Sequence, residues 1–251
     1  MTKYLFRLSF LVLITFLSGC SYHPRDSVPR PSPRPSVEKL APKSFVIKPV
    51  PYETSKIPEV VDRPILIVID PGHGGDDFGT RSLSKPKYHE KSLNLTTALI
   101  LKDYLQKMGY QTVMTRSEDE FIALQKRAEL ANDNGANLFV SVHYNSAPAK
   151  KADGVEVFYY KSAENGPRSQ ESSKLASSVL AQVTRLTNAK SRGVKHGNFA
   201  VIRETRMPAI LIEGGFLTNE EEMEKIKDPM YVKKIAWGIA QGIRDYFNMN
   251  K

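Results

Sequence analysis

The sequence predicts an α/β domain, in which a twisted, mostly parallel sheet of about six strands carries helices on both faces. Two observations support this class. Short apolar runs rich in β-branched residues alternate with longer amphipathic segments, as they do in parallel sheets. Three of these runs end abruptly in polar residues and glycine, which is typical of strands that lead into a functional edge. A chain of 251 residues leaves room for one such domain behind an amino-terminal leader.

Residues 1–19 predict a lipoprotein signal peptide. Lys3 and Arg7 precede the uncharged run 8–17, which is far shorter than the roughly 20 residues of a membrane-spanning helix. The following Leu-Ser-Gly-Cys, which ends at Cys20, resembles a bacterial lipobox, whose cysteine is lipidated. Because Cys20 is the only cysteine, the chain has no internal disulfide and no cysteine-based zinc site. An ordinary signal peptide with a chance cysteine is the alternative.

Residues 20–63 predict a Pro-rich, disordered tether. Their Pro, Ser, Lys and Arg cannot bury enough apolar surface to offset the entropy lost on ordering, so an extended spacer is expected. The sequence therefore predicts a domain held by a lipid anchor at Cys20 on the periplasmic side of the envelope. Ser21 favours the outer membrane by the usual sorting residue.

The formal net charge of +9 would suit nucleic acid, an anionic lipid surface or an acidic polymer. An exported chain does not normally meet nucleic acid, and aromatic and basic residues are not interleaved as they are in single-strand binders. We expect no nucleic-acid partner and a general attraction to an anionic envelope surface.

The elements of the domain, residues 64–251, follow from hydrophobic periodicity. Strands are expected over 65–69, 111–115, 138–143, 155–160 and 209–212, with a further short one over 199–202. Helices are expected over 90–108, 121–134, 169–186 and 230–247. Gly109 and Gly135 supply stop signals for the first two helices.

Four chemically useful side chains follow or flank these strands. His73 comes just after the first strand, His143 ends the third and Glu213 ends the last, while Glu90 stands at the expected start of the first helix. Since the carboxyl ends of parallel strands meet at one edge of a sheet, these side chains should gather there.

Two imidazoles and a carboxylate leave one position of a tetrahedral Zn²⁺ open, which is the arrangement of a hydrolytic site. His73, Glu90 and His143 fill the ligand roles, and Glu213 is then available to accept the water proton and pass it to the leaving amine. The ligands lack the spacing of an HExxH helix, so a zincin is not expected.

Longer motifs surround these residues. They are Asp-Pro-Gly-His-Gly-Gly at 70–75, Glu-Lys-Ser-Leu-Asn-Leu at 90–95, Thr115-Arg116, Leu124, Arg127, Ala131-Asn132, Ser-Val-His-Tyr-Asn at 141–145, and Pro-Ala-Ile-Leu-Ile-Glu-Gly-Gly-Phe-Leu-Thr-Asn at 208–219. In identity and order they resemble the zinc-dependent N-acetylmuramoyl-L-alanine amidases of the amidase-3 family, over essentially the whole domain.

The resemblance implies that His73, Glu90 and His143 bind zinc and that Glu213 is catalytic. It makes residues 64–251 a zinc amidase catalytic domain, whose substrate is peptidoglycan or a muropeptide. The bond cleaved would be the amide between N-acetylmuramic acid and L-alanine, in cell-wall remodelling and septum cleavage. A non-catalytic peptidoglycan-binding lipoprotein is the alternative, although a binder would not need Glu213.

For several neighbouring residues, the sequence allows two possible roles. His89 could replace Glu90 as the ligand, although the surrounding motif favours Glu90. Asn145 either orients a ligand or caps the next turn, and His196 is either a substrate-side or a surface residue. For Arg116 and Arg127, pairing with acids such as Asp119 or Glu129 is favoured over binding of a peptide carboxylate.

Regulation by an inserted helix is not expected. Some members of the family carry a long helix after the third strand that blocks the zinc site until an activator removes it. Here residues 147–153 lead almost directly into the next strand, and the loop 161–168 is short. The sequence therefore predicts no obligatory activator.

A second set of motifs loosely resembles that of penicillin-binding proteins, whose activated serine is acylated by the D-Ala-D-Ala end of the stem peptide. The set consists of Ser82 with Lys85, Ser92 with Asn94, and Lys-His-Gly at 195–197. A serine-type D,D-carboxypeptidase activity is therefore an additional hypothesis. Pro86 argues against it, because it interrupts the helix that such a serine begins.

Overall fold

The computed structural model describes residues 64–249, and it confirms an α/β fold built on one six-stranded sheet. The strands are β1 (Leu66–Pro71), β2 (Gln111–Met114), β3 (Leu138–Asn145), β4 (Val155–Tyr159), β5 (Ser191–His196) and β6 (Ala209–Phe216). The helices are α1 (Glu90–Lys107), α2 (Leu124–Asp133), α3 (Pro167–Thr187), α4 (Ala200–Arg203), α5 (Glu220–Ile226) and α6 (Pro229–Met249). The strand order is β2-β1-β3-β6-β4-β5.

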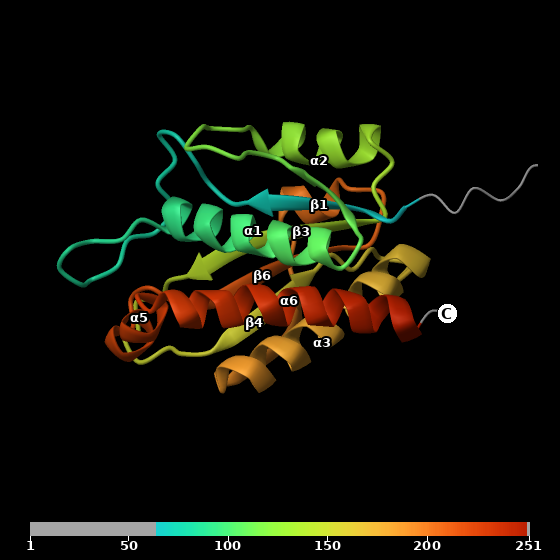
Figure 1. Ribbon diagram of the computed structural model, residues 1–251. Helices are drawn as coiled ribbons and strands as arrows, with labels where there is room; N and C mark the ends of the chain where they lie inside the picture. Colours follow the sequence, from blue (N-terminus) through green and yellow to red (C-terminus); the bar gives the residue numbers. More distant parts are fainter. Residues whose placement is uncertain (1–63, 250–251) are drawn as a thin grey trace, which may run out of the picture. The chain divides into compact units, whose positions relative to one another are not determined.

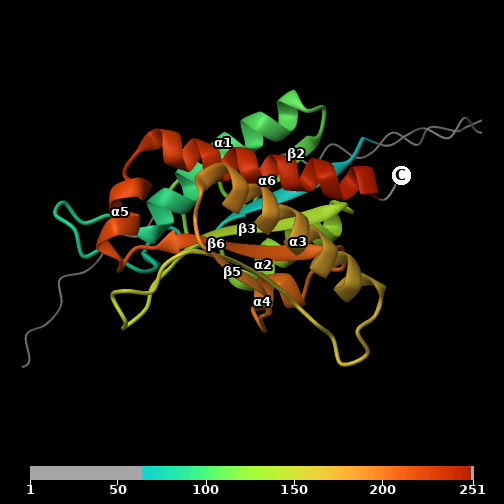
Figure 2. The same cartoon turned by 90° about the horizontal axis from the view of Figure 1, so that it is seen from below.

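Helices cover both faces of the sheet, as expected (Figure 1). One core lies beneath α1, α3 and α6 and receives Ile67 and Ile69 from β1. The second core lies beneath α2 and α4 and receives Val68, the residue between them. Because successive strand side chains point to opposite faces, a strand covered on both sides reads as one continuous apolar run. Figure 2 shows α1 and α6 on one side of the sheet and α4 on the other.

The sheet is mostly parallel, with one reversal that positions the site. All neighbouring pairs are parallel except β4 and β6, which run antiparallel. The first residues of β4 and β5 therefore lie at the same edge as the last residues of β3 and β6. In register, His143 lies beside Glu213, and Glu213 lies beside Glu156.

Three elements differ from the sequence expectations. Residues 199–202 do not form a strand, since they belong largely to the short helix α4. The sixth strand is instead β5, which the hydrophobic pattern missed because this edge strand pairs on one side only and carries Arg192, Lys195 and His196. Helix α5 was not expected either. Its start is fixed by Asn219, whose side chain accepts a hydrogen bond from the Glu222 amide.

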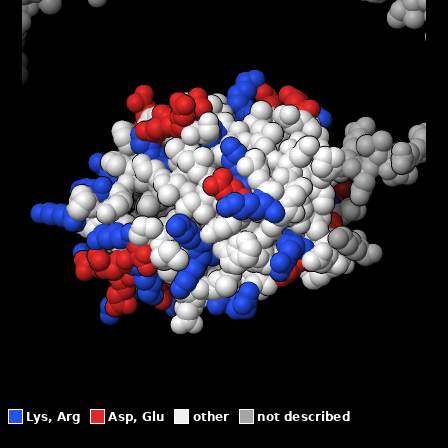
Figure 3. All heavy atoms as spheres, viewed as in Figure 1, with Lys and Arg blue, Asp and Glu red and all other residues white. Residues whose placement is uncertain are grey.

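The predicted export signal, the lipidation site Cys20 and the tether 20–63 lie outside the described residues. Within residues 64–249, no helix combines the length and the hydropathy needed to cross a membrane. On the face seen in Figure 3, lysine and arginine side chains are scattered among groups of acidic ones.

Candidate active site

His73, Glu90 and His143 come together at the carboxyl edge of the parallel strands. One donor atom from each residue lies within 4.8 Å of the other two. The nearest oxygen of Glu90, Oε1, is 3.2 Å from Nε2 of His73 and 2.9 Å from Nδ1 of His143. Three segments that are distant in sequence therefore converge on one small volume, as the sequence predicted.

The backbone around these ligands leaves no room for larger residues. A Cβ at Gly79 would lie 2.6 Å from Oε2 of Glu90 and 2.7 Å from Cδ2 of His73, and this glycine has a φ of +63°. A Cβ at Gly72 would lie 2.1 Å from the ring of His143. The two glycines therefore allow the chain to pass directly behind the three side chains.

Hydrogen bonds fix the orientation of the ligands. Nδ1 of His73 is 2.8 Å from Oδ2 of Asp77, which leaves Nε2 directed at Glu90. Oε2 of Glu90 accepts a hydrogen bond from the Thr80 amide at 2.9 Å. Asn94 donates through Nδ2 to the Gly72 carbonyl at 3.1 Å and to Oε1 of Glu90 at 3.4 Å. A carboxylate that holds the second nitrogen of a histidine is a recurring support for metal ligands.

The pKa values of Glu90 and His73 are shifted in opposite directions by their mutual contacts. Burial alone would raise the pKa of Glu90, but hydrogen bonds from His143 and His73 hold it well below its usual range. Burial opposes protonation of His73, yet hydrogen bonds and charge from Glu90 and Asp77 raise its pKa. The ionised carboxylate of Glu90 attracts a cation, and a divalent ion bound by the ring of His73 would require that ring to be unprotonated.

Glu213 lies next to this group. Its Cα pairs with that of His143 across β3 and β6, and its Oε2 is buried without a hydrogen-bond partner in the described part of the chain. Burial, together with the charges of Glu90 and Glu156, raises the pKa of Glu213 well above that of an ordinary glutamate. A buried carboxyl without a hydrogen-bond partner, beside a His-Glu-His group, is the arrangement expected of a proton carrier at a zinc site. Two histidines and one carboxylate are also a donor set that fits Zn²⁺.

A hollow of about 210 Å³ opens beside His73 and His143. Its lining also includes the apolar side chains of Leu124 from α2 and Phe199 before α4, which are 52% and 40% exposed. Exposed apolar side chains beside a polar centre are typical of a ligand site, because they exclude water from one side of the bound molecule.

Two residues with open interpretations lie beside the ligand group without joining it. His89 is not a member of the three-residue group, and its ring packs 5.0 Å from that of Phe78. Asn145 donates to Oε1 of Glu156 at 2.7 Å, and its own Oδ1 accepts from the Ser146 amide. The structure thus places Asn145 in contact with Glu156 and the next turn, where its amide holds Glu156 rather than a metal ligand.

His196 lies at the other end of β5. It pairs in register with Tyr159, three residues beyond Glu156, and its Nδ1 accepts a hydrogen bond from the Lys161 amide at 3.1 Å. Of its two interpretations, this position fits a surface residue, because His196 is exposed and lies away from the sheet edge that holds Glu213.

Arg116 and Arg127 are structural, but their partners were wrongly predicted. Arg127 forms a buried ion pair with Asp70 at 2.9 Å and donates to the carbonyl of His73. Arg116 donates to the carbonyls of Pro71, Gly72 and Lys91. Both guanidinium groups hold the turn after β1, which explains their burial.

Neither of the acids suggested as partners forms a hydrogen bond or an ion pair with these arginines, although the charge of Asp119 acts on Arg116. Asp119 pairs with Lys91 at 2.7 Å, and Glu129 pairs with Lys126 at 2.6 Å. The sequence also missed Asp77 and Glu156. Asp77 could have been noticed from its position four residues after His73, whereas Glu156 sits in an ordinary strand pattern and gave no signal.

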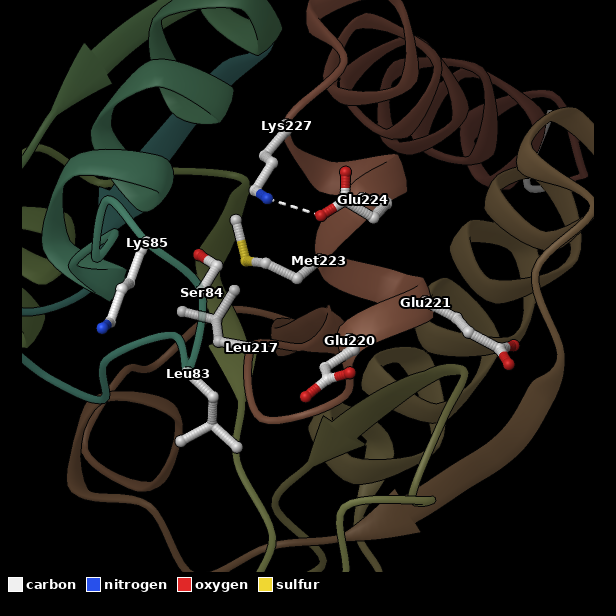
Figure 4. A pocket seen from close by; sticks show the side chains of 9 residues that line it. All are labelled: Leu83, Ser84, Lys85, Leu217, Glu220, Glu221, Met223, Glu224 and Lys227. Atoms are coloured by element: carbon white, nitrogen blue, oxygen red, sulfur yellow. Dashed lines mark hydrogen bonds and ion pairs between the residues drawn. The ribbon is translucent and has the colours of Figure 1, made fainter.

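The serine hypothesis is not supported by the geometry. Ser82 is 1% exposed, and its hydroxyl bonds the Ser84 hydroxyl and the Tyr88 amide rather than Lys85. Lys85 lies at a separate hollow of about 390 Å³ against α5, where its side chain extends away from Ser84 (Figure 4). Ser92 is exposed on α1 and Asn94 supports Glu90, so these residues do not form an activated serine.

Comparison with known proteins agrees with this geometry. Residues 67–245 match the family Amidase_3, described as N-acetylmuramoyl-L-alanine amidase. The chain is 35% identical over 189 residues to the N-acetylmuramoyl-L-alanine amidase CwlM of Bacillus licheniformis, covering 74% of this chain and 70% of that protein. It is 34% identical over 182 residues to the probable cell wall amidase LytH of Staphylococcus epidermidis, of which it spans 58%.

Solved structures show the same fold. The N-acetylmuramoyl-L-alanine amidase of Clostridium difficile 630 matches with a TM-score of 0.70 at 38% identity, over 75% of this chain and 99% of that one. The CwlD amidase of Clostridioides difficile, solved in complex with the GerS lipoprotein, matches with a TM-score of 0.68 at 30% identity, over 74% and 99%. Since the family match spans most of the described residues and includes every residue of the site, this chain belongs to the Amidase_3 family of N-acetylmuramoyl-L-alanine amidases.

Proposed function

We propose that this chain is a zinc-dependent hydrolase that cleaves the amide between N-acetylmuramic acid and L-alanine in peptidoglycan. The observation that carries the proposal is the close group of His73, Glu90 and His143 beside the unpartnered carboxyl of Glu213. Family membership supports the amidase reaction, and the donor set supports the metal.

In the proposed mechanism, His73, Glu90 and His143 would hold Zn²⁺, and Asp77 keeps His73 oriented. A zinc ion bound there would supply a Lewis acid, which activates water and polarises a carbonyl. Glu213 accepts a proton from the attacking water and delivers it to the amide nitrogen as the C–N bond breaks. The products are the muramic acid carboxylate and the free amino group of L-alanine.

A defined muropeptide tests this proposal directly. The purified protein should release the intact stem peptide, detected by mass spectrometry, and a chelator should abolish the release until Zn²⁺ is added back. If no stem peptide appears at any zinc concentration, the protein is not an amidase and only the alternative of peptidoglycan binding remains.

The cellular location belongs to the same proposal. The Leu-Ser-Gly-Cys motif ending at Cys20 and the Pro-rich residues after it support a lipid anchor with a tether, on the periplasmic side of the envelope and preferentially in the outer membrane. We further propose a role in cell-wall remodelling and septum cleavage. Cells expressing a Cys20→Ser variant should show no incorporation of labelled palmitate into the protein, and the protein should leave the membrane fraction. An unchanged membrane fraction would contradict the anchor.

We also propose that the enzyme needs no activator. Residues 146–154, which link β3 to β4, contain no helix that could block the site. The related CwlD was solved in complex with the GerS lipoprotein, so a partner is the competing outcome. Full latency of the purified zinc-loaded protein, relieved by adding an envelope fraction, would contradict the proposal.

A further inference from the structure

A cationic pair lies on the sheet beside the proposed catalytic residues. His143, Glu213 and Glu156 occupy matching positions on β3, β6 and β4 and therefore share one face of the sheet. The next strand, β5, contributes Arg192 and Lys195, which both bind Glu156. Across neighbouring strands, the metal ligand His143 is therefore followed by Glu213, then by Glu156, and then by two positive charges on β5.

Glu156 holds the two cations in place. It is 4% exposed and receives hydrogen bonds from Arg192 Nε at 2.8 Å, from Asn145 Nδ2 at 2.7 Å and from Lys195 Nζ. One carboxylate cannot neutralise two cations, and an ammonium and a guanidinium together carry more N–H groups than Glu156 accepts. The pair therefore keeps one net positive charge and free donors for an anionic ligand.

Side-chain contacts link the lining of the hollow beside the ligands to this cationic pair. Leu211, part of its lining, pairs in register with Phe158 of β4, and the ring of Phe158 contacts that of Phe199 with centroids 5.2 Å apart. Lys195 Nζ lies 5.9 Å from the centroid of the Phe158 ring. Aromatic side chains thus connect the apolar wall of the hollow with the cations.

The proposed substrate carries an anion at a matching distance. In the stem peptide, the residue after L-alanine is D-glutamate linked through its γ-carboxyl, so its α-carboxylate is free unless it is amidated. Two extended residues span about 7 Å. Neighbouring strands lie about 4.8 Å apart, which puts Glu156 roughly 5 Å from Glu213. A peptide whose scissile amide lies at Glu213 can therefore reach the cations that surround Glu156.

We propose that Arg192 and Lys195 form a subsite for the free α-carboxylate of the second stem-peptide residue, so that the enzyme prefers the carboxylate over the amidated form. The inference rests on the proposed amidase function and adds a specificity to it. Glu156 and Asn145 position the two cations, and neither touches the reacting bond.

The test compares two synthetic muramyl peptides that differ only in a free or an amidated α-carboxyl on the second residue. We expect the wild-type protein to cleave the carboxylate form with a kcat/KM about tenfold higher, mostly through KM, which corresponds to about 1.4 kcal/mol of binding free energy. Lys195→Gln and Arg192→Gln should each bring this ratio toward one, whereas Lys195→Arg should retain it.

Lys190→Gln is the matched control. Lys190 precedes β5 and pairs with Asp153 at 2.9 Å on the exposed surface. Its substitution changes the net charge of the protein by the same amount as Lys195→Gln, and it should leave the ratio of the two kcat/KM values unchanged. The zinc content and thermal midpoint of each variant show whether it is still folded. If the ion pair were merely structural, its loss would lower the cleavage rates of both peptides without changing their ratio. Equal cleavage of the two peptides by the wild type would overturn the subsite while leaving the amidase function intact. Cleavage of neither would overturn the proposed function itself.

Discussion

Each side chain of the site is specified by contacts that leave it few alternatives. His73 is fixed between Asp77 and Glu90, and Glu90 is fixed between the two histidines and the Thr80 amide. Glu213 differs, since its buried Oε2 has no partner within the described residues. The ligands are therefore held by hydrogen bonds, while the proposed proton carrier remains available for chemistry.

The first prediction separates metal binding from proton transfer. Glu213→Gln should retain bound zinc and lose activity by a factor of about 10²–10⁴, because an amide cannot carry the proton. His73→Ala should lose both zinc and activity. Zinc content by mass spectrometry and release of stem peptide provide the two readouts. A Glu213→Gln protein with nearly normal turnover would show that another group carries the proton.

A second prediction concerns the buried carboxylate of Glu156. Burial would raise its pKa, but hydrogen bonds and charge from Lys195 and Arg192 lower it. The ionised form is thus the one that stabilises the fold, and its contribution is present above the unfolded-state pKa and lost as pH falls through the lower folded-state value.

Glu156→Gln should therefore lower the free energy of unfolding at pH 7, and its difference from the wild type should shrink below about pH 4.5. Urea denaturation at several pH values measures this difference, with Glu164→Gln on the exposed loop as the control. A difference that stays constant with pH would mean that the carboxylate charge is not what stabilises this part of the sheet.

At the scale of the element, the turns after the strands carry the site and the arginines behind them hold the turns. Arg127 on α2 pairs with Asp70 at the end of β1, and Arg116 donates to the carbonyls of Pro71 and Gly72 in the turn that follows. Removing one partner of such a buried pair leaves an uncompensated charge, which is why these arginines behave as structural residues.

The third prediction addresses the turn between β1 and α1. Gly79→Ala would introduce a Cβ 2.6 Å from Glu90 Oε2 at a φ of +63°, so the loop must move and the ligands must separate. We expect weaker zinc binding in a protein that still folds, measured by competition with a chromogenic chelator. Gly166→Ala, whose Cβ would meet no atom within 4 Å, is the control and should bind zinc normally.

At the scale of the whole molecule, the ligands tie together segments that are far apart in sequence. His73, Glu90 and His143 come from the turn after β1, the start of α1 and the end of β3. A metal that binds only this folded arrangement shifts the folding equilibrium by mass action.

The fourth prediction follows from this linkage. Zinc at 100 times its dissociation constant should stabilise the protein by about 2.7 kcal/mol and raise its thermal midpoint, and a chelator should reverse the shift. His143→Ala is the control and should show no response to zinc. A midpoint that zinc does not change in the wild type would contradict a metal site built from these residues.

The fold class can be predicted from the amino-acid sequence, because strands covered on both faces must be continuously apolar and helices must be amphipathic. It also brought His73, Glu90, His143 and Glu213 to one predicted edge, because the positions of polar residues at strand ends are visible in the chain. Strand β5 was not predicted from the hydrophobic pattern, because an edge strand with one partner and an exposed side needs no apolar run.

Only the tertiary structure decided which long-range partners meet. The reversal of β4 against β6 places Glu156 beside Glu213 and brings Arg192 and Lys195 to the site, although nothing in their local sequence indicates this. The pairing of Arg127 with Asp70 likewise depends on how α2 packs over β1. The local sequence pattern indicates burial and periodicity. Strand order and register depend instead on the packing of the whole sheet, and strand order and register decide which charged residues become neighbours.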